Sequence, residues 1–439
     1  MIKDRIGYSY NDLTIIPKTI SKIESRSQID VFYKSNNKIF LPIFTAPMAS
    51  VVSDKNYKVF SDNYIIPIIP RNIPIKNRRE FFENQIDVWV ALSLKEFEDL
   101  FIKNYPHHNQ GCTYKVCVDI ANGHMEKLYK LCVKAKEISI GISAGYNLQI
   151  MTGNIANPNT YKYICDNCVY KDNKGYLQQA IDYIRVGIGG GSGCITSSNT
   201  AIHYPQATLI DEIYDIKQRY KAKYVDRRYP YIIADGGIRN YSDVIKALGL
   251  GADYVMIGSL LARSIESAGV KYNKNLNQKV NVKFPIENYE RYRCDDKGNW
   301  HGYYTEKFLN HLLQPWQDKL DYAKEHFGEL HNEYFEAKGK FEDRKKDLES
   351  EKVIGPIEVK FFGMASKDGQ LSIDGKKTKT AEGITKMLPV KFTIHGWVEN
   401  MISYMRSSMS YCNVQDLYEF IGEQTFIVNS ISEINAVNK

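Results

Sequence analysis

Short apolar runs recur along the chain and alternate with longer segments whose apolar residues follow a helical period. Eight runs read as strands, at 42–49, 64–69, 87–94, 115–120, 148–153, 182–188, 231–234 and 253–257. Helical periodicity appears between several of them, at 124–137, 208–221 and 240–251. Apolar strands that alternate with helices are typical of a parallel sheet covered by helices. Eight such units predict an α/β chain folded as a closed (β/α)8 TIM barrel, and an open doubly wound sheet is the alternative.

After Gly269 the alternation of strands and helices stops. Residues 270–353 are rich in Lys, Asn, Glu and Tyr, and 305–350 show a helical period with charges of both signs on most faces. We interpret 270–353 as an inserted helical hairpin that packs on the barrel or on another subunit. A charged helix surrounded by solvent is the alternative.

The last part of the chain returns to the composition of a compact domain. Residues 363–383 are polar and contain several glycines, a profile typical of a mobile flap. A helix is expected at 397–412 and a strand at 425–431. The chain is therefore predicted to divide into three parts. These are 1–269, the main part of the barrel; 270–353, the helical insertion before the flap; and 354–439, the flap and the C-terminal completion of the barrel.

Length and composition agree with such a fold. The 439 residues are 43% hydrophobic and 12% aromatic, which is enough for a sizeable core. The net charge of +7 is compatible with anionic small molecules and with nucleic acid. Because acidic residues are interleaved with the basic ones throughout the insertion, we do not expect nucleic acid to be a partner.

The N-terminus and the cysteines bear on the compartment. The first residues, MIKDRIGYSYND, lack an apolar signal segment, and no run approaches the roughly 18 apolar residues of a membrane span. We therefore expect a cytoplasmic protein with reduced thiols and no membrane partner. Cys165 and Cys168 form one C-x-x-C pair, which is half of a zinc site or a redox pair. Since no second pair matches it, we do not expect a structural metal.

Small and polar residues gather where the predicted strands end, which is where the chemistry of a barrel is found. The clearest such loop is GIGGGSGC, residues 187–194, after the sixth strand. Its glycines let backbone groups approach an anion or a cation closely, and it ends on one thiol, Cys194. This arrangement favours a nucleophile beside a bound phosphate ester. A glycine-rich turn with a cysteine in the core is the alternative.

Two further glycine loops follow the seventh and eighth strands, DGG at 235–237 and GS at 258–259. The last two loops of many barrels bind a phosphate group at a helix N-terminus. These loops therefore predict a phosphate site, and a plain turn at Gly236–Gly237 is the alternative.

Taken together and in this order, the loops resemble the IMP dehydrogenase / GMP reductase family. The similar segments are TAPMASVVS, VDIANGH, DYIRVGIGGGSGCIT, ADGGIRNYSDVIKALGLGADYVMIGSLLARSIES, FFGMAS, AEGITKMLPVKFTIHG and RSSMSY. They cover about residues 8–269 and 354–430, and the insertion lies outside them. The resemblance implies a barrel enzyme that acts on a purine mononucleotide and is a homotetramer.

The resemblance also implies roles for single residues. Cys194 matches the nucleophile that attacks C2 of the purine, and Thr196 and Glu382 match the residues that handle the departing ammonia. Asp119 and Asn154 match positions near the nicotinamide of NADPH or NAD. The carbonyls of Gly189, Gly191 and Cys194 match a site for a monovalent cation such as K+. The positions that match nucleotide-binding residues are Met48, Ser192, Asp235, Gly236, Gly237, Gly258, Ser259, Met364 and Ala365.

The flap bears on which reaction the resemblance implies. IMP dehydrogenases hydrolyse their adduct with an Arg-Tyr pair in the flap, and residues 363–382 contain neither residue type. The short link at 71–87 also leaves no room for the regulatory modules that dehydrogenases usually carry. We therefore favour reductive deamination of GMP to IMP with NADPH. The alternatives are oxidation of IMP to XMP with NAD, and a nucleotide-binding barrel that recruits a partner.

Several residues depart from the family pattern. Gly190 stands where Pro is common and Gly193 where a branched residue is common, while Phe361 replaces a Tyr whose hydroxyl contacts the phosphate in dehydrogenases. Ser197 stands where Arg is frequent, and His203 replaces a Gly. These departures indicate either an altered substrate or a divergent lineage with unchanged chemistry.

Overall fold

The computed structural model describes most of the chain. The described residues are 6–35, 38–104, 111–141, 146–274, 278–280, 292–294, 300–303, 306–329, 331–350, 353–375, 380–430 and 433.

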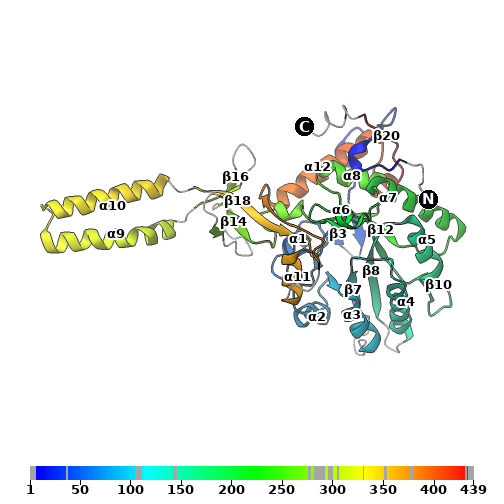
Figure 1. Cartoon of the computed structure of the whole chain (residues 1–439). Helices are drawn as coiled ribbons and strands as arrows, with labels where there is room; N and C mark the ends of the chain where they lie inside the picture. The colour runs from blue at the N-terminus through cyan, green and yellow to red at the C-terminus, as the bar shows by residue number, and fades with distance from the viewer. Residues whose placement is uncertain are drawn as a thin grey trace.

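Eight parallel strands form the centre of the molecule (Figure 1). In sheet order they are β4 (Ile43–Thr45), β13 (Tyr254–Ile257), β12 (Tyr231–Asp235), β11 (Tyr183–Val186), β8 (Asn147–Ile155), β7 (Thr113–Asp119), β6 (Trp89–Leu92) and β5 (Ile68–Ile69). A parallel bridge between Phe44 and Ile66 joins the two ends of this order and closes the sheet. The predicted (β/α)8 barrel is confirmed, and each of its strands overlaps a predicted run.

Large aromatic side chains fill part of the barrel interior. The ring of Tyr183 lies 4.9 Å from that of Trp89, 5.6 Å from that of Tyr254 and 6.0 Å from that of Phe44, measured between centroids. All of β6 and β13 is buried, as expected for strands covered on both faces. This packing leaves the polar chemistry to the strand ends.

Helices cover the outside of the barrel (Figure 1). They are α1 (Tyr57–Asp62), α2 (Ile75–Glu83), α3 (Leu94–Glu98), α4 (Glu126–Gly141), α5 (Pro158–Asn167), α6 (Thr196–Thr200), α7 (Gln206–Lys223), α8 (Tyr241–Gly249), α12 (Ile394–Tyr411) and α13 (Leu417–Phe420). Short helical turns are η1 (Tyr10–Asp12), η2 (Arg26–Gln28), η3 (Asp99–Lys103) and η4 (Leu261–Arg263). The helices expected at 124–137, 208–221, 240–251 and 397–412 are all present.

Three small antiparallel pairs complete the barrel domain. They are β1 (Leu13–Ile15) with β20 (Phe426–Val428), β2 (Tyr33–Ser35) with β3 (Lys38–Phe40), and β9 (Val169–Lys171) with β10 (Leu177–Gln179). The pair β1–β20 ties the two ends of the described chain together. The strand expected at 425–431 is therefore present as β20.

The insertion differs from the expectation. It contains an antiparallel sheet in the order β15 (Gln278–Val280), β14 (Lys271–Asn273), β18 (Val353–Phe362), β17 (Trp300–Tyr303) and β16 (Tyr292–Cys294), with β19 (Thr385–Pro389) also paired to β18. These strands were not predicted, because β14 to β17 are only three or four residues long and lie in polar sequence. The sheet joins β14 and β18, at the two ends of the insertion, to β19 beyond the flap.

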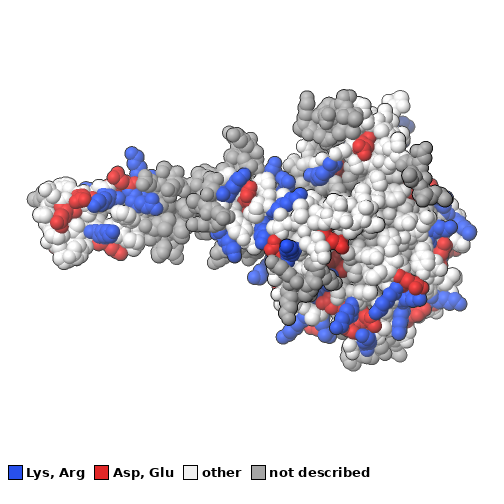
Figure 2. All heavy atoms as spheres, in the orientation of Figure 1, with Lys and Arg blue, Asp and Glu red and all other residues white. Residues whose placement is uncertain are grey.

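The expected helical hairpin is present as α9 (Glu306–Phe327) and α10 (Asn332–Ser350). Figure 1 shows the two helices side by side, pointing away from the barrel. Ala323 is buried between them, and Lys and Arg alternate with Asp and Glu on their surface (Figure 2). The hairpin does not pack on the barrel, because α9 and α10 pack on each other and extend away from it. Tyr322, Phe327 and Phe335 remain exposed. Packing on another subunit stays a prediction.

The flap expected at 363–383 contains a helix that was not predicted, α11 (Lys367–Asp374), which is capped by the Ser366 hydroxyl.

Cys165 and Cys168 are core residues, and burial raises the pKa of each thiol to about 12. Among the described residues, no three His, Cys, Asp or Glu side chains gather into a metal-binding group. None of the described helices is both long and apolar enough to span a bilayer.

Candidate active site

The carboxyl ends of the barrel strands and the flap enclose a cavity of about 340 Å³. Most of the residues predicted for the site line it. They are Met48, Asp119, Gly191, Ser192, Cys194, Asp235, Gly236, Gly237, Gly258, Ser259, Met364, Ala365 and Glu382. Three predicted residues, Asn154, Gly189 and Thr196, do not line the cavity, but each is hydrogen-bonded to a residue of the loops around it.

The loop that carries Cys194 needs glycine at its start. Gly187 and Gly189 have φ angles of +129° and +79°, in the left-handed region that other residues rarely adopt. A side chain at Gly187 would also collide with Gln206, whose amide donates to the Val186 carbonyl at 2.7 Å. The backbone therefore turns sharply out of β11 and brings the thiol to the cavity.

Cys194, Thr196 and Glu382 form one hydrogen-bonded chain. The Cys194 thiol donates to the Thr196 hydroxyl at 3.2 Å, and that hydroxyl donates to Oε2 of Glu382 at 3.0 Å. A nucleophile joined through a hydroxyl to a carboxylate is an arrangement that can move a proton to or from the reacting centre.

The flap is bonded to the cysteine loop through the backbone. The Ile195 N–H donates to the Glu382 carbonyl and the Ile384 N–H to the Gly193 carbonyl, both at 2.9 Å, around a bridge between Cys194 and Gly383. These bonds hold the Glu382 side chain beside Thr196, 186 residues earlier in the chain.

The departures at Gly193 and Phe361 are explained together. Phe361 is buried, lines the cavity, and has its ring against the cysteine loop. A β-carbon at Gly193 would lie 2.9 Å from that ring and 3.2 Å from the Gly363 nitrogen. The ring thus occupies the space that a branched residue would need. By contrast, a β-carbon at Gly190 would have ordinary contacts, and nothing in the structure explains the glycine there.

Glycines open the part of the cavity predicted to hold a phosphate. Gly236 and Gly237 have φ angles of +98° and +77°, and a β-carbon at Gly258 would lie 3.0 Å from the sulfur of Met48. The backbone is therefore exposed where Ser192 and Ser259 also reach the cavity. Exposed N–H groups and hydroxyls are suitable donors for a phosphate.

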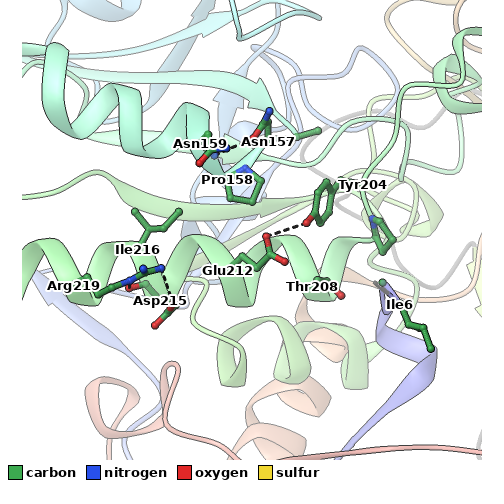
Figure 3. A pocket seen from close by; sticks show the side chains of 13 residues that line it. Ile6, Asn157, Pro158, Asn159, Tyr204, Thr208, Glu212, Asp215, Ile216 and Arg219 are labelled. Carbon is green, nitrogen blue, oxygen red and sulfur yellow. Dashed lines mark hydrogen bonds and ion pairs between the residues drawn. The ribbon is translucent and has the colours of Figure 1, made fainter. Parts of the chain in front are cut away.

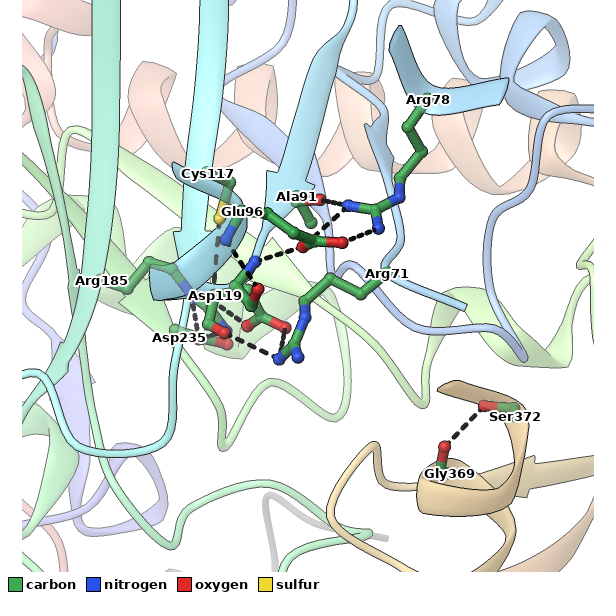
Figure 4. Close-up of polar contacts among 11 residues, drawn as sticks. Arg71, Arg78, Ala91, Glu96, Cys117, Asp119, Arg185, Asp235, Gly369 and Ser372 are labelled. Atoms are coloured by element: carbon green, nitrogen blue, oxygen red, sulfur yellow. Dashed lines mark hydrogen bonds and ion pairs between the residues drawn. The ribbon is translucent and has the colours of Figure 1, made fainter. Parts of the chain in front are cut away.

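An arginine that sequence reasoning missed, Arg185, joins two of the predicted residues (Figure 4). Nε and a terminal nitrogen of Arg185 lie 2.9 Å from Oδ2 of Asp235, and Nη1 donates to Oδ1 of Asp119 at 2.7 Å. The side-chain amide of Asn154 donates to the same Asp235 oxygen at 2.7 Å. Burial disfavours the charged form of Arg185, but Asp235, Cys117 and Asp119 outweigh it and raise the pKa of the guanidinium. The signal in the sequence was a charged residue inside the apolar strand YIRV.

Arg71 donates to the Asp119 carbonyl at 3.1 Å, so a second cation lies behind Asp119. The departures at Ser197 and His203 also have partners. The Ser197 hydroxyl donates to the Gly189 carbonyl at 3.3 Å, and Nδ1 of His203 lies 2.9 Å from the Ile188 carbonyl. Ser197 and His203 therefore support the cysteine loop from its outer side.

A second, larger cavity of about 560 Å³ lies between the start of α5 and α7 (Figure 3). None of the predicted site residues lines it. Tyr204 donates to Glu212 at 2.9 Å, and Arg219 pairs with Asp215 at 2.8 Å within its wall. These charged side chains are thus engaged with one another, and the chemistry is concentrated in the cavity of Cys194.

The chain is similar to known proteins of one family. Residues 108–283 match the model of the IMP dehydrogenase / GMP reductase domain. The chain is 23% identical over 453 residues to a protein named GMP reductase from Shewanella pealeana, which covers 100% of the chain and 99% of that protein. GMP reductases from Vibrio vulnificus and Aliivibrio fischeri are each 24% identical, over 455 and 453 residues, with the same coverage.

Proposed function

We propose that the chain is a GMP reductase of the IMP dehydrogenase / GMP reductase family, whose domain model matches residues 108–283. In this proposal it converts GMP to IMP and ammonia with NADPH, through an adduct on Cys194. The observation that carries the proposal is the chain of hydrogen bonds from the Cys194 thiol through Thr196 to Glu382.

The first half of the reaction is a substitution at C2 of the purine. The Cys194 sulfur forms a bond to C2 as its proton passes to Thr196 and Glu382. The bond from C2 to the amino nitrogen then breaks, and the nitrogen leaves as ammonia with a proton returned by the same pair. A carboxylate that reaches the reacting centre through a hydroxyl can serve in both directions.

The second half replaces the sulfur by hydrogen. NADPH, when bound, supplies a hydride to C2. The bond from sulfur to C2 then breaks, and the electron pair returns to Cys194 as thiolate. The protein's part in this half is to hold C2 toward the side of the cavity that Asp119 lines, and to take the thiolate back beside Thr196.

The nucleotide is proposed to lie with its phosphate on the glycine loops. Ser192, Gly236, Gly237, Gly258 and Ser259 line that end of the cavity. Asp235 is the acceptor for the ribose hydroxyls, and Met48, Met364 and Ala365 contact the base. Because Phe361 lacks a hydroxyl, backbone and serine donors alone contact the phosphate at this position.

The nicotinamide dinucleotide is proposed to bind on the side of the cavity that Asp119 lines. Asp119 is a hydrogen-bond acceptor for a carboxamide or ribose, and Arg71 beside it is a cation suited to a phosphate group. Asn154 acts indirectly in this proposal, since its amide is bonded to Asp235 and to the Gly187 carbonyl.

Two further parts of the proposal follow from the resemblance. The carbonyls of Gly189, Gly191 and Cys194 are candidates for a monovalent cation, although Gly189 and Gly191 also accept hydrogen bonds within the protein. We also propose a homotetramer, which light scattering on the purified full chain tests directly.

Reduction is favoured over dehydrogenation by what the flap contains. Hydrolysis of the adduct requires a group that activates water, and residues 363–382 include neither Arg nor Tyr. Reduction takes its hydride from the cofactor and requires from the protein a proton for the leaving nitrogen, for which Thr196 and Glu382 are in contact.

The test is an absorbance assay at the nicotinamide band with two substrate pairs, GMP with NADPH and IMP with NAD. We expect GMP-dependent loss of NADPH that Cys194→Ala abolishes. Cys112→Ala is the matched control, since Cys112 is also only half buried but lies outside the cavity. Reduction of NAD by IMP without GMP-dependent loss of NADPH would contradict the proposal. Binding of GMP without turnover of either pair would favour a nucleotide-binding module instead.

A further inference from the structure

The guanidinium of Arg185 lies between two carboxylates that belong to different halves of the site. Asp235 ends β12 on the proposed nucleotide side, and Asp119 ends β7 on the proposed cofactor side. Arg185 contacts Oδ2 of Asp235 at 2.9 Å and Oδ1 of Asp119 at 2.7 Å. One buried cation therefore connects the two ligand-binding regions (Figure 4).

Each carboxylate uses one oxygen for Arg185 and keeps the other. The donors to Asp235, from Arg185 and Asn154, all converge on Oδ2, and no described residue donates to Oδ1. Oδ2 of Asp119 has only the more distant Arg71 nitrogen, at 4.0 Å. A ligand at either free oxygen changes how strongly that carboxylate attracts the shared guanidinium.

The surrounding fold keeps Arg185 in this position. Its partner in β8 is Gly153, where a β-carbon would lie 2.7 Å from the β-carbon of Arg185. Arg185 is only 8% exposed, so its guanidinium is held between the two carboxylates and away from solvent. A lysine could keep the charge, but its single nitrogen cannot reproduce a planar fork that bonds two carboxylates.

From this geometry we propose that Arg185 is a positioning residue that couples nucleotide binding at Asp235 to cofactor binding at Asp119. The inference rests on the proposed function for the assignment of the two carboxylates to the two ligands. Binding of the first ligand to the free oxygen of one carboxylate fixes the orientation of that carboxylate and, through Arg185, that of the other. The second ligand therefore meets a site that is already ordered. The two ligands therefore bind more tightly together than alone, and by reciprocity each strengthens the other equally.

The chain offers a matched control. Arg78 is also a buried arginine near the barrel wall, paired to Glu96 at 2.5 Å and bonded to the Ile73 carbonyl at 2.7 Å. Figure 4 shows it beside the Arg185 cluster, and it does not line the cavity. Arg78→Lys and Arg185→Lys are the same chemical change at a buried ion pair, and only the second lies between ligand sites.

The experiment measures GMP binding by calorimetry in the Cys194→Ala protein, which cannot form the adduct. The dissociation constant is measured without NADPH and with saturating NADPH. We expect NADPH to tighten GMP binding about tenfold, within the usual range of such coupling. Arg185→Lys should reduce that factor to below about twofold, and Arg78→Lys should leave it unchanged.

A second variant keeps the proposal testable if Arg185→Lys does not fold. Asp119→Asn alters only the proposed cofactor side, yet it should weaken GMP binding in the absence of cofactor by about fivefold, through Arg185. An unchanged GMP affinity in Asp119→Asn would overturn the proposal. The proposal would also be overturned if NADPH tightened GMP binding by the same factor in Arg185→Lys as in its Cys194→Ala parent, or if it had no effect on GMP binding in that parent. A loss of this factor in Arg78→Lys as large as in Arg185→Lys would overturn it as well.

The failure of the proposed function is recognised separately. If the wild-type chain turns over IMP with NAD and not GMP with NADPH, the reductase assignment fails. The titration is then made with IMP and NAD, and the same comparison of variants decides whether Arg185 couples the two sites.

Discussion

Thr196 is the residue whose loss separates catalysis from binding most cleanly. Thr196→Val removes the hydroxyl that joins the Cys194 thiol to Glu382 while nearly preserving the volume of the side chain. Thr196 does not line the cavity. We therefore expect a large fall in kcat for GMP reduction and a KM for GMP within about threefold of the wild-type value.

The size of the fall follows from the two bonds that are lost. The bond to the Glu382 carboxylate, at 3.0 Å, is charge-assisted and contributes about 1.5–3 kcal/mol. That energy corresponds to about 10- to 150-fold in rate. Loss of the proton path through the hydroxyl adds to this, since positioned acid–base groups contribute about 10²- to 10⁴-fold. A fall in kcat of about 10²- to 10³-fold is the expected result.

The assay is the steady-state loss of NADPH absorbance at varied GMP, with single-turnover measurement of ammonia release. Thr196→Ser retains the hydroxyl and should keep most of the activity. Thr200→Val is the control in the same helix. The exposed hydroxyl of Thr200 donates to the Thr196 carbonyl at 2.7 Å and takes no part in the hydrogen bonds that join Cys194 to Glu382. A kcat for Thr196→Val within threefold of wild type, or an equal loss in Thr200→Val, would refute the reasoning.

Three further predictions test other parts of the structure. Gly193→Val should lower the free energy of unfolding by about 1–3 kcal/mol, because the valine side chain is overpacked against the Phe361 ring. Adding Phe361→Leu should restore part of that free energy, as measured by thermal denaturation. Burial lowers the pKa of Lys271 to about 7, so the unfolded chain binds this proton more tightly than the folded one. Between about pH 7 and 10.5, the free energy of unfolding of the wild type, measured in urea, should therefore rise relative to that of Lys271→Met. The same pH dependence of this free energy in both proteins would contradict the prediction. Replacing 306–350 by a short turn should leave kcat within about threefold, because α9 and α10 pack on each other, and a larger loss would show that the hairpin supports the site.

The barrel was predictable because its strands are buried on both faces. Runs such as the one that became β6, WVAL, are apolar throughout, and the polar loops after them mark the ends of the strands. The same property made the cysteine loop visible, since GIGGGSGC interrupts that pattern. The strands β14 to β17 gave no such signal, because they lie in polar sequence and are stabilised by pairing with β18 and with one another.

The site residues were predictable one at a time, but their connections were not. Cys194 and Glu382 are separated by a long insertion, and only the backbone bridge between the flap and the cysteine loop brings them together. Arg185 illustrates the limit further, because its partners lie far away in the chain: Asp235 is 50 residues after it and Asp119 is 66 residues before it. Phe361 and Gly193 each looked like an isolated departure, and their packing shows that they form one adaptation.

The stoichiometry of the reaction tests the central claim most directly. Purified protein is incubated with GMP and NADPH, and IMP, ammonia and oxidised cofactor are quantified in the same sample. The account predicts equal amounts of all three, and none of them with Cys194→Ala. Formation of XMP from IMP and NAD, without ammonia release from GMP, would contradict it.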